Sequence, residues 1–387
     1  MWGTEMAERR TRRSVRSGLS QVGALGATTA GTLRKRRRSK KTGQGGQDPW
    51  ADEDFTRIYS DEASTVIADD GVGLAVRTVV TGDRKSETAP ELTVIFVHGF
   101  TLRMASWHFQ RYGLAQRWAD RRIRMVFYDQ RGHGRSDPAT RAGCTIHQTA
   151  EDLAAVMRAV APTGPVVLVG HSMGGMTIMR LARNHPTLFG YRGRITGVAL
   201  VSTALRGITE AGLGEGLNNP VVDALRVSVR YIPGLVQAGR GVTRQAVQPV
   251  LVAASFGPDY YSPATESAVE KMIQNTSIAT MVNFLKALES HDESTSVPVL
   301  AQVPSSVMCG DQDRLTPLPN SVRMYSELGE DSRLVIGEGC GHMLPMEFPD
   351  LVNDAIVNLV DRSRLARNRP TMRWYGNREE AAHGDAH

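Results

Sequence analysis

A serine, an aspartate and a histidine each follow a stretch that reads as a strand, in the order Ser172, Asp313, His342. A serine hydroxyl is a poor nucleophile until a base removes its proton and a third group orients that base. A carboxylate can orient an imidazole, and an imidazole, with an ordinary pKa of about 6.5, transfers protons near neutral pH. These three residue types therefore predict nucleophilic catalysis, provided that the fold brings them together.

Ser172 lies in the middle of a Gly-x-Ser-x-Gly pentapeptide, residues 170–174, between a predicted strand and a predicted helix. The Val-rich run 165–169 is typical of a strand buried on both faces, and residues 176–183 are rich in helix formers. Glycines at both ends allow a turn tight enough to raise the serine hydroxyl above the end of a sheet. The helix start adds unpaired N–H groups and a positive dipole end. We therefore predict that Ser172 is the nucleophile.

Two aspartates compete for the role of the acid in segment 310–317, which follows a buried strand. A carboxylate in the loop beyond the strand reaches farther than one at its tip, so Asp313 is the predicted acid. Asp311 is expected to accept hydrogen bonds from N–H groups of its turn. The predicted base is His342, because it ends the Gly-rich loop 337–342 after the last strand, where its flanks are flexible.

Two backbone amides are predicted to bind a negatively charged oxygen. Residues 97–101, Val-His-Gly-Phe-Thr, follow a buried strand at the same sheet edge as the serine. The N–H of Phe100 and the N–H of Met173, at the helix start, could converge on one oxygen, and losing one such donor typically costs about 10²–10³ in rate. The side chain of His98 is predicted to be structural rather than catalytic.

The elements that must position these residues alternate between strands and helices. Two β-rich runs about an Asp-Asp-Gly turn predict a hairpin over 65–80, and apolar residues at helical spacing predict a helix over 145–160. Further strands are predicted at 92–97, 124–128, 195–201, 305–309 and 333–336. The alternation predicts an α/β fold with a mostly parallel central sheet and helices on both faces. Residues 204–295 interrupt it and are too many for a loop, so we predict an inserted helical cap.

The chain is ordinary for a globular protein in composition, with 387 residues of which 41% are hydrophobic and 22% charged. Its length is ample for a large core. The predicted parts are a disordered basic arm (1–50), a first core part (51–203), the helical cap (204–295), a second core part (296–365) and a polar tail (366–387).

The net charge of +6 comes from the N-terminal arm. Residues 1–48 contain 12 Lys and Arg against 3 Asp and Glu, whereas the remainder contains 34 against 37. The stretch 19–33 is too short and too weakly apolar to span a membrane, and makes a poor signal peptide. Three interpretations of the arm stay open: a solvated tail, attachment to an anionic membrane surface, and binding of a partner such as a nucleic acid. Nucleic acid is disfavoured because no aromatic residues interleave the basic clusters.

The sequence predicts no cofactor and no metal. Gly-rich phosphate loops are absent, the three cysteines have no Cys-x-x-Cys spacing, and His383 and His387 stand in a polar tail without a helical pattern. Cys340 is predicted to be a small turn residue rather than a redox switch. Few, scattered cysteines favour a reducing compartment, so we expect a cytoplasmic protein, with membrane association through residues 1–48 as the open alternative. The oligomeric state is not indicated by the sequence.

Taken together, these segments resemble the α/β-hydrolase superfamily. The resemblance covers roughly residues 64–203 and 296–362 in the order typical of that superfamily. The matching motifs are His98-Gly-Phe100 with Trp107, Asp129-Gln-Arg-Gly-His-Gly-Arg-Ser136, Gly170-His-Ser-Met-Gly174, Gly310-Asp-Gln-Asp313 with Pro317, and Gly341-His342. The resemblance implies a Ser172 nucleophile, an Asp313 acid, a His342 base and an oxyanion hole formed by the Phe100 and Met173 amides. It also implies that residues 129–136 form a structural turn near the floor of the site.

Within the superfamily the chain is most similar to esterases, cofactor-free haloperoxidase-like enzymes and epoxide-hydrolase relatives. Epoxide hydrolases and haloalkane dehalogenases use an aspartate nucleophile, so the serine at 172 argues against both. Many relatives have a proline after His-Gly-Phe, where this chain has Thr101. The basic arm lies outside the resemblance.

These features predict a serine hydrolase that cleaves a small carboxylic ester. An apolar acyl or aryl group is favoured by five cap residues, which could instead pack the cap onto the core: Tyr260, Tyr261, Met272, Met281 and Phe284. The same triad also serves thioesterases, amidases, carbon–carbon hydrolases and perhydrolases, because a fold does not determine a substrate. A protein of a different class, a non-catalytic ligand-binding protein on the same scaffold, is the remaining alternative.

Overall fold

The computed structural model describes residues 47–83, 88–190, 192–206, 252 and 254–368. Several predictions concern residues outside these ranges: most of the basic arm, part of the predicted cap (207–251 and 253), and most of the polar tail with His383 and His387.

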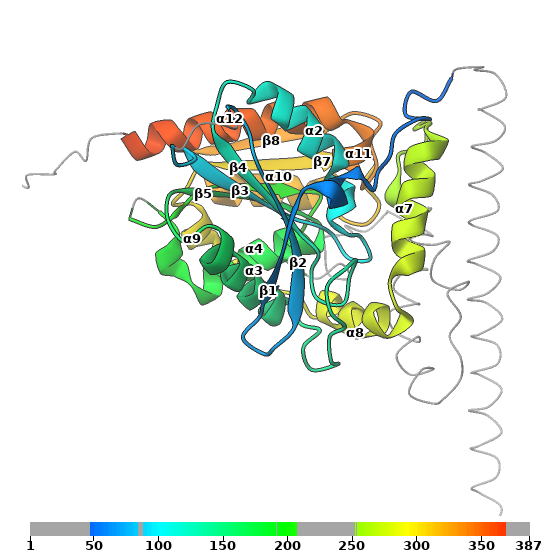
Figure 1. The fold of residues 1–387 in the computed structure, drawn as a ribbon, viewed down its shortest axis with the longest axis horizontal. Helices are drawn as coiled ribbons and strands as arrows, with labels where there is room; N and C mark the ends of the chain where they lie inside the picture. The colour runs from blue at the N-terminus through cyan, green and yellow to red at the C-terminus, as the bar shows by residue number, and fades with distance from the viewer. Residues whose placement is uncertain (1–46, 84–87, 191, 207–251, 253, 369–387) are drawn as a thin grey trace, which may run out of the picture.

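A single eight-stranded sheet forms the centre of the described protein, in the order β1-β2-β4-β3-β5-β6-β7-β8 (Figure 1). Strand β2 runs antiparallel to both of its neighbours, and the remaining pairs are parallel. The strands are β1 (Glu62–Ile67), β2 (Gly73–Val80), β3 (Leu92–Val97), β4 (Ile123–Tyr128), β5 (Val166–His171), β6 (Ile195–Val201), β7 (Ser305–Gly310) and β8 (Ser332–Gly337). The predicted α/β class with a mostly parallel sheet is confirmed.

Helices cover both faces of the sheet (Figure 1). The larger hydrophobic cluster joins one face to α2, α11 and α12, and a second cluster joins the other face to α3, α4, α9 and α10. The helices are α2 (His108–Arg117), α3 (Ile146–Val160), α4 (Met173–Asn184), α7 (Pro263–Asn275), α8 (Ile278–Glu289), α9 (Val297–Leu300), α10 (Leu318–Leu328), α11 (Leu344–Glu347) and α12 (Pro349–Asn368). Short 3₁₀ turns are η1 (Arg57–Ser60), η2 (Met104–Trp107), η3 (Pro186–Leu188) and η4 (Ser294–Ser296).

Local sequence explains why these segments fold as they do. Every residue of β3 and of β5 is buried, as expected for continuous apolar runs between two helical layers. Helix α3 starts at an N-cap threonine, because the side chain of Thr145 accepts a hydrogen bond from the N–H of Gln148 at 3.0 Å. Because β3, β5, β7 and β8 run parallel, their carboxyl ends meet at one edge of the sheet, from which the candidate site residues extend.

Two helices of the predicted cap, α7 and α8, lie between β6 and β7 in the chain. Each begins at a serine N-cap, Ser262 for α7 and Ser277 for α8. Both helices pack on the body of the protein: Met272 of α7 and Met281 of α8 belong to the larger core cluster. The described part of the cap therefore shares the core of the sheet domain.

The ends of the described chain are more ordered than the sequence indicates. Residues assigned to the arm make specific contacts: Asp48 accepts hydrogen bonds from Ser262 Oγ and from the N–H of Ala264, both at 2.8 Å, and the ring of Trp50 lies 4.6 Å from that of Phe109. At the other end, α12 continues to Asn368 and so includes the first three residues of the predicted tail (366–368).

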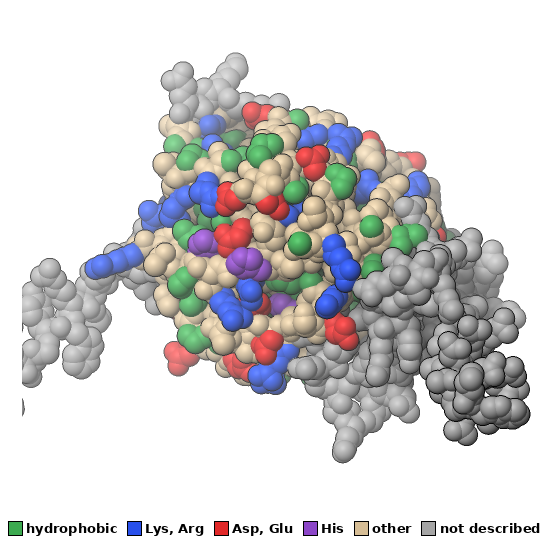
Figure 2. All heavy atoms as spheres, turned by 90° about the horizontal axis from the view of Figure 1, so that it is seen from below, with side chains coloured by type: hydrophobic (Ala, Val, Ile, Leu, Met, Phe, Trp, Pro, Cys, Tyr) green, Lys and Arg blue, Asp and Glu red, His purple; other side chains and the backbone are tan. Residues whose placement is uncertain are grey.

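The surface seen in Figure 2 mixes charges of both signs, with hydrophobic side chains in small separate groups. This face of the described protein therefore presents no extended basic patch of the kind that binds nucleic acid. None of the helices in the described ranges has the length and apolar character needed to cross a bilayer.

Candidate active site

Ser172 occupies a strained turn between β5 and α4. Its φ of 53° and ψ of −119° are rare for a residue with a side chain, and such a conformation costs about 1–3 kcal/mol. Its N–H donates to the carbonyl of Val201 at 2.9 Å, and its own carbonyl accepts from Thr203 Oγ1 at 2.8 Å. The predicted strand, turn and helix around Ser172 are confirmed, and the surrounding bonds hold the serine in a conformation it would not adopt alone.

Two glycines allow neighbouring segments to approach Ser172 closely. A Cβ on Gly174 would collide with the carbonyl of Val97 at the end of β3. A Cβ on Gly99 would stand 2.9 Å from Nδ1 of His171 and 3.2 Å from Cβ of the serine. The loop after β3, which contains Phe100, therefore lies directly against the serine turn.

The structure pairs Asp313 with His342. The imidazole Nδ1 is 2.9 Å from Asp313 Oδ2, and both side chains are buried. Oδ1 of the aspartate accepts from the N–H of Leu315 at 2.8 Å and from that of Thr316 at 2.9 Å. Burial opposes ionisation of Asp313, but the adjacent imidazole and these hydrogen bonds outweigh it and hold the pKa of the carboxyl below its usual value. Asp313 is thus fixed as an anionic acceptor facing the imidazole.

Thr316 is a further member of the site that sequence reasoning missed. Its Oγ1 donates to Asp313 Oδ2 at 2.8 Å and lies 3.4 Å from His342 Nδ1. The hydroxyl therefore restrains the carboxylate oxygen that the backbone donors leave free for the imidazole. Asp313 and Thr316 lie in one short loop, and this proximity in sequence was the available signal.

Glu347 holds the loop that carries His342, and no sequence pattern indicated this role. Its carboxylate, in a side chain only 8% exposed, accepts from the N–H of Gly341 at 3.0 and 3.2 Å and from the N–H of Gly257 at 2.8 Å. One buried carboxylate thereby joins the histidine loop to the cap segment just before α7.

His171, the residue before the serine, contacts the base directly. Its Nε2 lies 2.9 Å from the carbonyl oxygen of His342, to which it donates, and the two rings are 4.9 Å apart. Burial, together with the nearby imidazole of His342, lowers the pKa of His171 to about 3, so its ring is neutral. This contact brings the serine turn and the histidine loop to the same place at the sheet edge.

The two amides predicted for the oxyanion hole flank the serine turn. Met173 is the first residue of α4, and Phe100 lies in the turn that closes with the N–H of Leu102 donating to the carbonyl of Gly99 at 3.2 Å. Within the described ranges, neither the Phe100 amide nor the Met173 amide donates to another backbone group. Both remain predicted donors.

Other singled-out residues have structural roles. His98 is fully buried, with Nδ1 donating to the carbonyl of Gly99 and Nε2 accepting from the N–H of Gln130, as predicted. Asp311 accepts from the N–H of Gly339 at 2.7 Å, so it bonds an amide of the histidine loop rather than of its own turn. Cys340 is buried, and burial raises the pKa of its thiol, which fits a turn residue better than a redox switch.

The turn at residues 129–136 is also structural. The carboxylate of Asp129 accepts from the N–H of Met104 at 2.7 Å and from that of Arg135 at 2.8 Å. Arg131 is fully buried between the carboxylates of Asp152 and Asp70. The turn is therefore structural, as the family resemblance implied, and it contacts the loop after β3 through Gln130 and His133.

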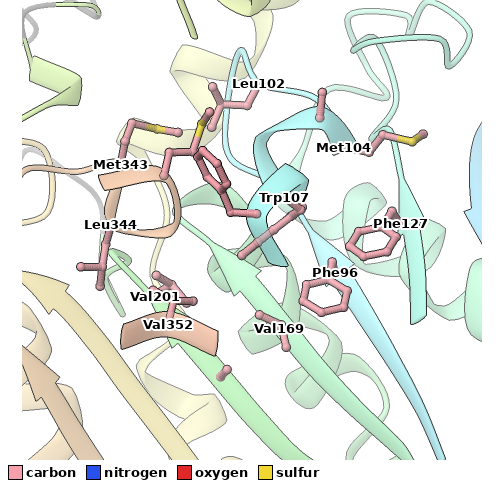
Figure 3. Packing of buried hydrophobic residues seen from close by; sticks show 14 of the residues in the cluster. Phe96, Leu102, Met104, Trp107, Phe127, Val169, Val201, Met343, Leu344 and Val352 are labelled. Atoms are coloured by element: carbon pink, nitrogen blue, oxygen red, sulfur yellow. The ribbon is translucent and has the colours of Figure 1, made fainter. Parts of the chain in front are cut away.

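The apolar cap residues predicted to face a substrate are mostly used in packing. Met272, Met281 and Phe284 are buried in hydrophobic clusters, the last beside Met173. Tyr260 donates to the carbonyl of Met346, and Tyr261 is 40% exposed. Figure 3 shows the adjoining part of the larger cluster, to which β3, β4, η2 and the histidine loop all contribute (Phe96, Phe127, Trp107, Met343).

Comparison with known proteins identifies the family. The profile of the Alpha/beta hydrolase family matches residues 94–355, and the chain belongs to this family. It is 29% identical over 280 residues to a non-heme haloperoxidase from Rhodococcus erythropolis, spanning 69% of this chain and 92% of the relative. It is 22% identical over 261 residues to a monoacylglycerol lipase from Mycolicibacterium smegmatis, spanning 66% and 82%. The solved structure of an esterase from Exiguobacterium antarcticum superposes with a TM-score of 0.61 at 20% identity, covering 78% of this chain and 100% of that one.

In the ranges that the structure describes, no group of three or more His, Cys, Asp or Glu side chains is arranged to hold a metal ion.

Proposed function

We propose that this α/β hydrolase is a serine esterase that cleaves a small carboxylic ester through an acyl-enzyme. The observation that carries the proposal is the 2.9 Å hydrogen bond between His342 and Asp313, at the sheet edge where Ser172 occupies its strained turn. An orienting carboxylate, an imidazole and a raised serine hydroxyl are the groups that acyl transfer requires.

In the proposed mechanism, Ser172 Oγ attacks the acyl carbon while its proton passes to Nε2 of His342. The imidazolium is stabilised by Asp313, which is held anionic by its donors. The carbonyl oxygen gains negative charge and accepts hydrogen bonds from the amides of Phe100 and Met173. The imidazolium then protonates the departing alcohol, and a water molecule, deprotonated by the same imidazole, attacks the acyl group and releases the acid.

The proposal is tested first by covalent labelling. A fluorophosphonate probe should label the wild-type protein at Ser172, and Ser172→Ala should abolish the labelling. Absence of labelling in the folded wild type would instead favour a non-catalytic ligand-binding protein on this scaffold.

The substrate is tested by a chain-length series of nitrophenyl esters. We propose an apolar acyl or aryl group, and this predicts that kcat/KM rises with acyl length. Perhydrolysis is the second candidate, because a non-heme haloperoxidase is among the more similar relatives. It would show as peracid formed from an ester and hydrogen peroxide. Thioesters, amides and carbon–carbon substrates complete the panel, since the same triad can serve each of them.

We also propose that the basic arm attaches the protein to anionic membrane surfaces, because clustered Lys and Arg contribute about 1 kcal/mol each near such a surface. The full chain should sediment with phosphatidylserine vesicles at low salt, and a chain lacking residues 1–46 should not. Equal sedimentation of both would leave the arm as a solvated tail.

A further inference from the structure

Thr101, next to the predicted oxyanion amide of Phe100, has an unusual backbone conformation. Its φ is 61°, in the left-handed region that side-chain-bearing residues rarely adopt. For a β-branched residue this conformation is a genuine outlier, so the surrounding structure must compensate for it.

Both polar groups of the Thr101 backbone have partners from other parts of the chain. Its N–H donates to Nε2 of His133 at 3.1 Å, and its carbonyl accepts from Oγ1 of Thr276 at 3.1 Å. Its own hydroxyl donates to the carbonyl of Phe100 at 2.6 Å. Three hydrogen bonds thus fix the two peptide groups that follow the Phe100 amide.

The ring of His133 is held so that its Nε2 accepts a hydrogen bond. Its Nδ1 lies 2.9 Å from the carbonyl of Arg131 and donates to it, which leaves Nε2 with a lone pair for the Thr101 amide. The ring is buried and lies 6.3 Å from that of Phe100 and 5.5 Å from that of Phe284 in α8. His133 therefore lies between the cap and the loop after β3 that carries Phe100 (residues 98–102, the oxyanion loop).

Thr276 comes from the junction between α7 and α8. It is 2% exposed, and its hydroxyl lies within hydrogen-bond distance of the carbonyl of Met272 as well as that of Thr101. Four residues later, Thr280 lies against Gly132, where an added Cβ would stand 3.0 Å from Thr280 Oγ1. The cap helices thus contact both the oxyanion loop and the turn that carries His133.

A proline at position 101 could not form this arrangement. Proline has no N–H to donate to His133, and its φ near −65° is far from the 61° observed. This chain restricts the position with hydrogen bonds, one of which comes from the cap.

We propose that Thr276 and His133 are positioning residues that hold the Phe100 amide in the oxyanion hole, so that the hole is complete only when the α7–α8 junction is docked. This inference rests on the proposed esterase function. If the junction moves away, the Thr101 carbonyl loses its donor and the left-handed turn loses part of its support. The Phe100 amide then no longer points at the reacting oxygen. The cap would thereby couple substrate enclosure to transition-state stabilisation.

The test compares Thr276→Val, which removes the hydroxyl at nearly constant volume, with Thr276→Ser, which keeps it. We expect Thr276→Val to lower kcat on a nitrophenyl ester by about 10- to 100-fold, with KM changed less than threefold, because a misdirected oxyanion donor affects the transition state and not substrate binding. Thr276→Ser should remain within about threefold of wild type in kcat. Affinity for a boronic acid, whose tetrahedral adduct occupies the hole, should fall in parallel with kcat.

Thr276→Ala serves as a second variant if the valine disturbs folding, and thermal unfolding identifies that case. Equal kcat and equal boronate affinity in Thr276→Val and Thr276→Ser would overturn the inference while leaving the esterase proposal intact. A folded wild type that neither hydrolyses esters nor reacts with fluorophosphonate would overturn both.

Discussion

Replacing Glu347 by glutamine tests whether one buried carboxylate positions the proposed base. The carboxylate accepts from two amides, those of Gly341 and Gly257, and His342 follows Gly341 directly. A hydrogen bond to a charged acceptor contributes about 1.5–3 kcal/mol. Glutamine keeps one acceptor oxygen but turns an NH₂ group toward the other amide. We therefore expect Glu347→Gln to lose about 2 kcal/mol of unfolding free energy, which corresponds to about 3 °C in Tm for a chain of this size, because the entropy of unfolding is about 2.1 cal/mol/K per residue.

Activity should fall as well, because the loop that carries the imidazole would shift. A displacement well below 1 Å is enough to cost about tenfold in kcat. The assays are urea denaturation followed by fluorescence, and nitrophenyl ester hydrolysis at saturating substrate. Glu338→Gln is the matched control, since Glu338 lies in the same loop with an exposed side chain. If Glu347→Gln matched Glu338→Gln in both stability and kcat, the reasoning would be refuted.

Three further outcomes are expected. Thr316→Val removes a donor to Asp313 and should lower kcat about tenfold with KM unchanged, whereas Thr316→Ser should not; equal rates for the two variants would contradict the assigned contact. Asp48→Ala should cost about 1 kcal/mol in urea denaturation, because Asp48 accepts from the first turn of α7, and an unchanged midpoint would exclude this role. The free energy of unfolding should also fall as the pH falls from about 6.5 toward 4, because the unfolded chain then binds protons that the folded chain does not. Each buried neutral histidine contributes a decrease of up to about 1.4 kcal/mol per pH unit. Burial lowers the pKa of His133 to about 4, that of His171 to about 3 and that of His291 to about 4. It also lowers the pKa of His98 and of His108. His291→Gln should flatten the slope by one such increment, and a slope equal to that of the wild type would contradict the prediction.

Much of the fold could be predicted because its strands carry a strong local signal. The runs at 92–97 and 195–201 are mostly apolar and rich in β-branched residues, and both become strands with the predicted bounds, β3 and β6. Helix α10 was not predicted, since its buried residues Ser321, Met324 and Leu328 are too few to mark an apolar face. Helix α2 was missed for a similar reason, because it buries polar residues such as Gln110 and Arg111.

The sequence predicted the site residues whose type is determined by the proposed reaction. It did not predict those whose role depends on how the loops pack. The pairing of Asp313 with His342 followed from their positions after strands of one parallel sheet. Glu347 and Thr276 could not be found in this way, because they act on amides and carbonyls that are distant in sequence. Such contacts depend on the register between loops, which no local pattern encodes. The packing of Met281 and Phe284 into the core, one of the two outcomes left open, likewise depends on where α8 docks.

The strained backbone of Ser172, the proposed nucleophile, lowers the stability of the fold at the position that turnover requires. A glycine would accept these angles freely. Ser172→Gly should therefore stabilise the fold by most of the roughly 1–3 kcal/mol that the strained serine costs, and the same substitution removes the hydroxyl. An inactive enzyme that melts later than the active one would be the direct signature of this conflict. Efforts to make the protein more heat-resistant by choosing the residue that best suits each local conformation would therefore remove the proposed nucleophile.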